Sequence, residues 1–125
     1  GLTLTKYKVV KGGNNPRTTF NHRIFVLYGL PYVECVSVLA HEHAHVWLNE
    51  RFIEAPLPVT EGFCNLASYL VLQREKSKLS SILLENMQNS ESPVYGAGYR
   101  MMRQKLGQAG WPALLREMKG KASPP

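Results

Sequence analysis

The side chains best suited to chemistry are gathered in one segment, His41-Glu42-His43-Ala44-His45. Residues four apart lie on the same face of an α-helix, so His41 and His45 can offer their imidazoles to one cation. Glu42 lies beside that face, where it can accept a proton from a zinc-bound water without being a ligand. His43 projects toward the opposite face, where we expect a packed or solvent-facing side chain. The pattern predicts a zinc ion and attack of water on a carbonyl, with Glu42 as general base.

The alternative interpretation of these histidines is an exposed polar helix without a metal. The flanking residues argue against it because they are apolar and predict a largely buried helix: Val36, Val38, Leu39, Ala40, Val46, Trp47 and Leu48. Buried imidazoles and carboxylates need polar partners, and a metal ion supplies them. We therefore favour a metal site.

A catalytic zinc usually takes three protein ligands and leaves its fourth position to water. The extended pattern with Gly three and His six residues after the second histidine is absent, because Leu48 and Arg51 occupy those positions. All nine acidic residues are Glu, so an Asp ligand is excluded. The one other histidine, His22, lies far upstream and is disfavoured. The remaining candidates are Glu50, Glu54 and Glu61.

Among these candidates, Glu61 meets the geometric demand best. Glu50 and Glu54 follow His45 too closely to fold back over it easily, whereas Glu61 begins a separate helix after a Pro-containing connection. That helix can lie antiparallel to the first and bring the carboxylate to the metal in a His-His-Glu arrangement. Without a metal, Glu61 would be a favourable charge in the first turn of its helix. Asn65, one turn further on, can orient a ligand imidazole by accepting its other N–H.

The elements that must position these side chains begin with two strands. Residues 2–9 alternate apolar and polar side chains, as a half-buried strand does, and residues 12–16 are a dense Gly, Asn and Pro turn signal. Residues 18–28 read as a second strand, so we expect a long hairpin. If the second strand lies at a sheet edge near the metal, an extended peptide can add to it through main-chain hydrogen bonds.

Helical patterns occupy most of the remaining chain. Pro31 suits the start of a helix that carries the histidines and runs to about Asn49. Residues 55–58 contain two prolines and are expected to be a linker, after which Thr60 caps a second helix to about Glu75. Further helical segments are expected at residues 79–87, 101–106 and 111–119, with a loop at 89–93 followed by Gly96-Ala97-Gly98.

Length and composition indicate one globular domain, residues 1–125, either complete or part of a longer protein. The net charge of +6 comes from scattered cations without interleaved aromatics, so we expect a solvated face and no nucleic-acid binding. The longest apolar stretch is too short to span a membrane. Cys35 and Cys64 match no zinc-binding spacing and are expected to be buried small side chains, which is consistent with a cytoplasmic location.

Four segments, taken together and in order, point to a family. They are Phe25-Val26-Leu27-Tyr28-Gly29-Leu30-Pro31, Leu39-Ala40-His41-Glu42 with His45-Val46-Trp47-Leu48, Glu61-Gly62-Phe63-Cys64, and Ser92-Pro93-Val94-Tyr95-Gly96-Ala97-Gly98-Tyr99-Arg100. With these segments the chain resembles the peptidase domain of the plant LIM-domain, ubiquitin-activated growth-regulating peptidases and their short bacterial relatives.

The resemblance implies a gluzincin-type zinc metallopeptidase. One zinc ion would be held by His41, His45 and Glu61, with Glu42 as the base. The expected fold is α+β: an N-terminal β-hairpin or small antiparallel sheet, then a zincin-like helical core whose second helix carries the third ligand. The resemblance also singles out Tyr95 and Tyr99. Either phenol can donate to the oxyanion of the reaction or simply pack against the glycine-rich turn.

The chain also departs from that family. It shows no LIM module and no ubiquitin-interacting helix, and Thr60 stands where we expect a second glutamate. Ubiquitin dependence is therefore not carried over. We expect a zinc-dependent endopeptidase that acts on a protein or peptide substrate, with further domains of a parent chain compatible with the sequence. The alternative is a non-catalytic, metal-containing module of the same fold that binds a protein.

Overall fold

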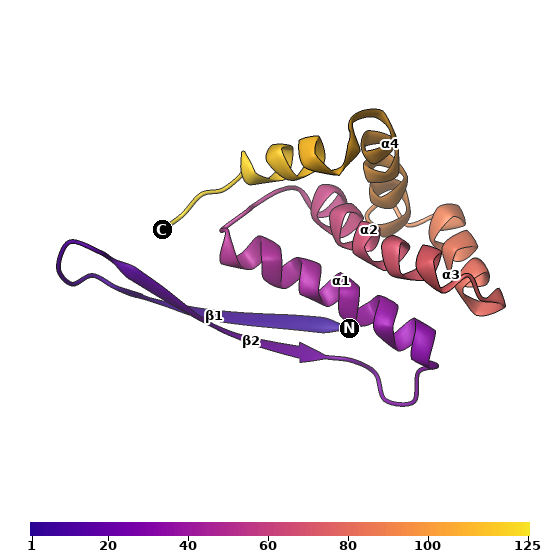
Figure 1. Cartoon of the computed structure of the whole chain (residues 1–125), viewed down its shortest axis with the longest axis horizontal. Coiled ribbons are helices and arrows are strands. Elements are labelled where there is room, and N and C mark those ends of the chain that lie inside the picture. The colour runs from indigo at the N-terminus through magenta and orange to yellow at the C-terminus, as the bar shows by residue number, and fades with distance from the viewer.

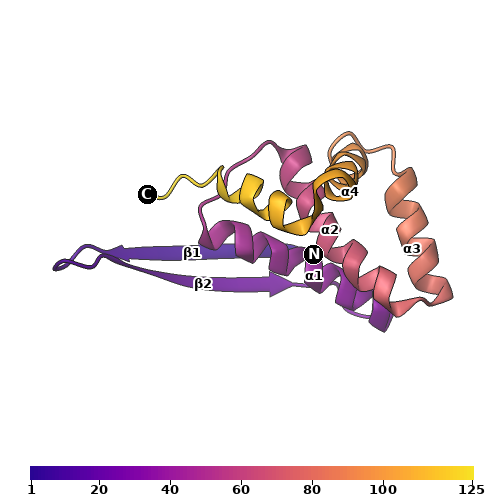
Figure 2. The same cartoon turned by 45° about the horizontal axis from the view of Figure 1, so that its top comes forward.

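The computed structural model describes residues 1–125 and has the expected α+β architecture, a two-stranded antiparallel sheet followed by four helices (Figure 1). The elements are β1 Leu2–Val10, β2 Arg17–Phe25, α1 Tyr32–Glu50, α2 Leu57–Glu75, α3 Lys78–Asn89 and α4 Tyr95–Lys119. The hairpin runs along one side of α1, α2 lies along the other side, and α4 covers α2 (Figures 1 and 2). None of the helices combines the length and apolar character needed to cross a membrane.

The predicted hairpin is confirmed, but its second strand is shorter than expected. In the β1–β2 register, Leu2 pairs with Phe25 and Val10 pairs with Arg17. Strand β2 ends at Phe25, three residues before the expected end at Tyr28, because β1 supplies no ladder partner before Leu2. Residues 26–28 therefore leave the sheet.

The first half of β1 packs on α1 through its polar positions rather than its apolar ones. Thr3 and Thr5 are partly buried, whereas Leu2 and Leu4 are exposed. Alternation usually directs apolar side chains inward. Here the inward threonines have hydrogen-bond partners on α1, namely Glu42 for Thr3 and Asn49 for Thr5.

Helix α2 begins earlier than the sequence signals suggest. The expected linker at residues 55–58 is wrong in its second half, because α2 starts at Leu57 with Pro56 as its N-cap residue. Pro58 is accommodated because the first turn of a helix has no use for its missing N–H. Thr60 does not cap the helix; its hydroxyl donates to the Ala55 carbonyl at 3.3 Å.

The last two expected helices belong to one element, α4, which is kinked at Gly110 (φ 80°, ψ 170°). The segment Gly96-Ala97-Gly98 lies within its first turn instead of forming a separate turn. A Cβ atom on Gly62 of α2 would clash with the Gly98 carbonyl, and one on Gly98 would clash with the Pro58 carbonyl. These glycines therefore allow the backbones of α2 and α4 to touch, which holds the N-terminal ends of the two helices together.

The hydrophobic core lies between α1, α2 and α4. It consists of nine buried residues, Leu48, Ile53, Phe63, Cys64, Leu66, Tyr99, Met102, Leu114 and Met118. A buried hydrogen bond of 2.7 Å from the Ser68 hydroxyl to the Ser37 carbonyl adds a polar link between α1 and α2. The two helices that carry the candidate metal ligands are thus fixed by the core itself.

Candidate metal centre

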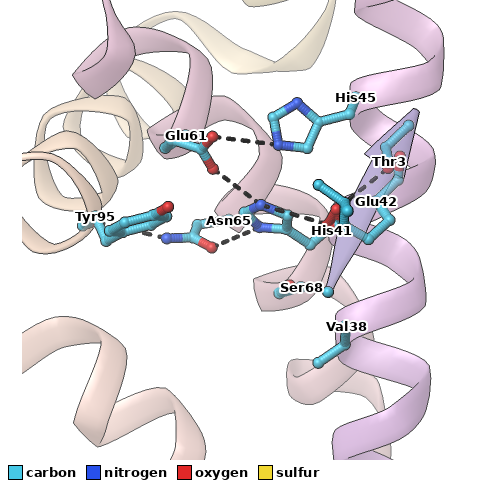
Figure 3. A pocket seen from close by; sticks show the side chains of 11 residues that line it. Thr3, Val38, His41, Glu42, His45, Glu61, Asn65, Ser68 and Tyr95 are labelled. Atoms are coloured by element: carbon cyan, nitrogen blue, oxygen red, sulfur yellow. Dashed lines mark hydrogen bonds and ion pairs between the residues drawn. The ribbon is translucent and has the colours of Figure 1, made fainter. Parts of the chain in front are cut away.

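His41 and His45 lie one turn apart on the face of α1 that meets α2, and Glu61 lies opposite them on the second turn of α2 (Figure 3). The Nε2 atom of His41 is 3.0 Å from one carboxylate oxygen of Glu61. The Nε2 atom of His45 is 3.3 Å from the other. The structure therefore brings together the three side chains expected to be ligands.

These distances can be compared with what zinc requires. Zinc–nitrogen and zinc–oxygen bonds are about 2.1 Å long, so two ligand atoms at a tetrahedral angle are separated by about 3.4 Å. The separations of 3.0 and 3.3 Å between Glu61 and the two imidazoles come close to this edge length. The His-His-Glu set is also a known donor set for catalytic zinc. The donor chemistry and these two distances are therefore compatible with a zinc ion.

Charge in the centre favours cation binding. Burial alone would raise the pKa of Glu61, but hydrogen bonds from His41 and His45 and the charges of both imidazoles hold it at about 2. The hydrogen bond to Glu61 raises the pKa of His45 against the opposing effect of burial. In the metal-free protein, a proton on His45 thus supplies part of the positive charge that a metal ion would bring.

Asn65 fixes the orientation of His41. Its Oδ1 atom lies 2.8 Å from His41 Nδ1, on the side of the ring away from Glu61. A donated Nδ1–H leaves Nε2 with its lone pair free for a cation, and such outer partners are usual at zinc sites. The amide of Asn65 is held in turn at 3.5 Å from the Tyr95 carbonyl. The role expected for Asn65 therefore has a matching geometry.

Glu42 is buried beside the histidines, with only 4% of its surface exposed. Its Oε2 atom lies 4.0 Å from His41 Nε2, which is too far for a hydrogen bond. The hydroxyl of Thr3 reaches Glu42 Oε1 and the Glu42 carbonyl, both at 3.2 Å. Sequence reasoning missed Thr3, because nothing in a strand pattern indicates which residue of a distant helix it will face.

A cavity of about 470 Å³ opens over this centre. Its lining comes from the start of β1, from α1 and α2 and from one tyrosine: Gly1, Leu2, Thr3, Val38, His41, Glu42, His45, Glu61, Asn65, Ser68 and Tyr95. The strand at the cavity is therefore β1, so the condition that residues 18–28 form the edge strand near the metal is not met. Strand β1 pairs with β2 on one edge only, so its other edge is free.

Of the two tyrosines singled out from the sequence, Tyr95 lines the cavity and Tyr99 does not. Tyr95 is half exposed and lies on the opposite side of His41 from Glu42 (Figure 3). Tyr99 is 3% exposed and belongs to the hydrophobic core, where burial raises the pKa of its phenol. The structure gives Tyr99 a packing position.

Cys64 is a second candidate for the third ligand. One donor atom each from His41, His45 and Cys64 lie within 4.8 Å of one another. The thiol is fully buried in the core, and this burial, with the charges of Glu61 and Glu42, raises its pKa. Zinc binds the thiolate rather than the thiol. The ionised carboxylate of Glu61, which already contacts both imidazoles, is therefore the better candidate for the third ligand.

The remaining histidines lie outside the centre. His43 is exposed, and its Nδ1 atom is 2.8 Å from the Leu39 carbonyl one turn earlier. His22 joins the hairpin to α1: its Nδ1 atom is 2.9 Å from the Thr5 hydroxyl, and its Nε2 atom is 2.8 Å from a Glu50 carboxylate oxygen. These two contacts occupy both ring nitrogens of His22. They also engage the carboxylate of Glu50, one of the other candidates for the third ligand.

The sequence model of the DA1-like family, described as Protein DA1, matches residues 5–82. These residues include His41, Glu42, His45 and Glu61 but not Tyr95. No solved structure matches the chain.

Curated relatives come from two plants. The Arabidopsis thaliana protein DA1-related 7 is 23% identical over an alignment covering 76% of this chain and 23% of that protein. DA1-related 1 from the same plant is 33% identical over 68% of this chain and 16% of its own length. The LIM domain-containing protein HDR3 of Oryza sativa subsp. japonica is 42% identical over 42% of this chain and 11% of its own. The chain thus spans less than a quarter of each relative.

Proposed function

This chain belongs to the DA1-like family, and from that premise and the geometry of the centre we propose that it is a zinc-dependent endopeptidase. The observation that carries the proposal is the Glu61 carboxylate placed between the Nε2 atoms of His41 and His45. A buried glutamate, Glu42, stands beside the same imidazoles. Ligands and a base on two core-fixed helices match the requirements of metal-assisted hydrolysis.

His41, His45 and Glu61 would hold the zinc ion, with Asn65 keeping the His41 ring in the orientation that directs Nε2 toward it. Bound there, zinc would act as a Lewis acid and would lower the pKa of water toward neutrality. The short connection between α1 and α2 and the packing of α2 on α4 preorganise this set before any ligand binds. Preorganised positions reduce the cost of forming the active arrangement.

Glu42 would act as the general base. Its carboxylate takes a proton from the attacking water and returns it to the nitrogen of the leaving amine. Burial removes competing water from the carboxylate, and the Thr3 hydroxyl holds one oxygen at 3.2 Å, which leaves the other for the reacting proton. Glu42 is therefore restricted to one orientation in the cavity.

Tyr95 would stabilise the oxyanion that develops on the scissile carbonyl. Its ring lines the cavity from the side of His41 opposite Glu42, as Figure 3 shows. A phenol there can donate a hydrogen bond to the oxyanion while the base works from the other side of the peptide group. The core position of Tyr99 makes it a poor candidate for the same role.

The substrate would be an extended protein or peptide segment. The free edge of β1 starts at the cavity, since Gly1, Leu2 and Thr3 line it. A peptide that adds to this edge by main-chain hydrogen bonds would bring a carbonyl over the ligands.

The test is proteolysis by zinc-loaded protein, with Glu42→Gln beside it. We expect one zinc ion per chain in both proteins and a loss of turnover of at least about 100-fold in the variant. Glu54→Gln, which alters an exposed glutamate outside the cavity, is the matched control and should cleave like the wild type. Full activity of Glu42→Gln would remove Glu42 from the mechanism. Stoichiometric zinc in a wild-type protein that cleaves no peptide would favour a non-catalytic binding module instead.

A further inference from the structure

A second cavity, of about 310 Å³, adjoins the metal centre. It shares Val38, Asn65, Ser68 and Tyr95 with the cavity over the ligands. In Figure 3, Val38 and Ser68 lie beyond His41 on the side away from His45. Binding clefts for small molecules occupy about 300–1,000 Å³, so this volume suits a single large side chain. A peptide bound over the ligands can therefore insert one side chain here.

Apolar side chains from α1, α2 and α3 form part of the walls of the second cavity. Leu72 of α2 is 1% exposed, and Leu83 and Met87 of α3 are partly buried. Val38 of α1 closes the side nearest the ligands. These walls can cover the methylene groups of a long side chain. These apolar groups provide no partner for a polar or charged group at the end of that side chain.

The polar group available to that tip is the carboxylate of Glu34, which also lines the second cavity. Glu34 precedes His41 by seven residues on α1, so the two share a helix face and are separated by about 10 Å along the axis. Glu34 is partly buried, and none of the chain's ion pairs involves it. Its negative charge therefore has no cation of the chain as a partner within the cavity.

The other polar groups near this cavity do not neutralise Glu34. Asn86 of α3 lines the cavity and adds an amide oxygen that can accept a hydrogen bond. Arg100 donates to the carbonyls of Gln88 and Ser90 at 3.0 and 2.7 Å, and it does not line the cavity. The cavity thus combines apolar side chains with the Glu34 carboxylate and the Asn86 amide oxygen, both of which can accept hydrogen bonds.

We propose that this second cavity is a specificity subsite for a lysine or arginine side chain of the substrate, next to the scissile bond. The aliphatic part would pack against Leu72, Leu83 and Met87, and the terminal cation would pair with Glu34. The proposal rests on the peptidase function above and deepens it. The competing role for Glu34 is a favourable charge in the first turn of α1, which affects helix stability but not the choice of substrate.

The first experiment measures cleavage of a position-scanning library of internally quenched peptides by the zinc-loaded protein. We expect one position beside the scissile bond to prefer Arg or Lys over norleucine by about 10–100-fold in kcat/KM, as befits a charge-assisted hydrogen bond. Glu34→Gln should abolish this ratio, and Glu34→Lys should favour acidic side chains. Glu85→Gln, on the exposed side of α3 and outside the cavity, should keep the wild-type ratio. A preference for Leu or Met that Glu34→Gln leaves unchanged would overturn the subsite and leave the peptidase function standing.

The second experiment does not depend on turnover. Zinc-loaded Glu42→Gln protein is titrated with two fluorescent peptides that differ only in arginine against citrulline, its uncharged analogue. Tighter binding of the arginine peptide, lost in the Glu42→Gln/Glu34→Gln double variant, supports the subsite even if no peptide is cleaved. Equal affinity for the two peptides would refute it. Absence of cleavage in the first experiment would refute the peptidase function instead.

Discussion

Replacing Glu61 with Gln tests the centre most directly, because the change keeps the shape of the side chain and removes its charge. The wild-type carboxylate contacts both imidazoles, at 3.0 and 3.3 Å. Losing an outer partner such as Asn65 costs about 10–100-fold in metal affinity at zinc sites. A lost ligand should cost more, so we expect Glu61→Gln to weaken zinc binding by at least about 100-fold, or about 2.7 kcal/mol.

The assay is competition of the folded protein with a zinc-chelating dye, checked by metal analysis after dialysis. Asn65→Ala should fall between the wild type and Glu61→Gln. Cys64→Ala should keep stoichiometric zinc, although the loss of one buried heavy atom should lower the free energy of unfolding by about 1 kcal/mol. Cobalt(II) substitution should show no thiolate charge-transfer band. Wild-type affinity in Glu61→Gln, with zinc lost in Cys64→Ala, would refute the His-His-Glu assignment and make Cys64 the ligand.

The same variant should change how the metal-free protein responds to pH. The pKa of Glu61 is lowered from 4.5 to about 2, so its contribution to stability is present above about pH 4.5 and disappears as pH falls toward 2. The pKa of His45 is raised above 6.5, so its contribution is present below pH 6.5 and disappears as pH rises through the raised value. Thermal unfolding of the metal-free wild type, measured with a chelator present, should show the stabilisation from the Glu61–His45 pair chiefly between about pH 4.5 and pH 6.5. Glu61→Gln should lack this stabilisation. Zinc affinity should instead increase with pH, because bound protons must leave the imidazoles.

Two further predictions concern the elements around the centre. Thr3→Val should lower kcat by about 10-fold at unchanged zinc content, because Glu42 loses the hydroxyl that orients it. Thr3→Ser, which keeps the hydroxyl, should restore the rate. A Thr3→Val enzyme as fast as wild type would rule out this positioning role. Gly98→Ala should lower the free energy of unfolding in urea by about 1–3 kcal/mol, because the new Cβ meets backbone of α2. Gly107→Ala, in the same helix with open space around it, should stabilise by up to about 1 kcal/mol; equal effects of the two substitutions would contradict the close crossing.

The limits of sequence reasoning are visible at the helix and strand boundaries. Helix α1 was predicted to within one residue because Pro31 and an apolar periodic pattern mark it. The start of α2 was missed because two prolines suggested a linker, although a proline in a first turn is compatible with a helix. The first turn of α4 was missed because glycines normally indicate turns. At Gly62 and Gly98 they serve helix packing, which only the partner helix makes necessary.

By itself, the sequence determined the local chemistry. The four-residue spacing of His41 and His45 puts both imidazoles on one helix face. The lack of Asp leaves Glu as the residue type that can supply a carboxylate ligand. Both follow from the sequence because helix periodicity and side-chain type are local properties. Tertiary structure decided what depends on contacts between distant segments. It brought Thr3 to Glu42, placed β1 rather than β2 at the cavity, buried Tyr99 while leaving Tyr95 in the cavity, and set Glu34 in a second cavity. The physical reason is that each of these outcomes follows from how the elements pack, and packing is not encoded in the spacing of residues along a single element.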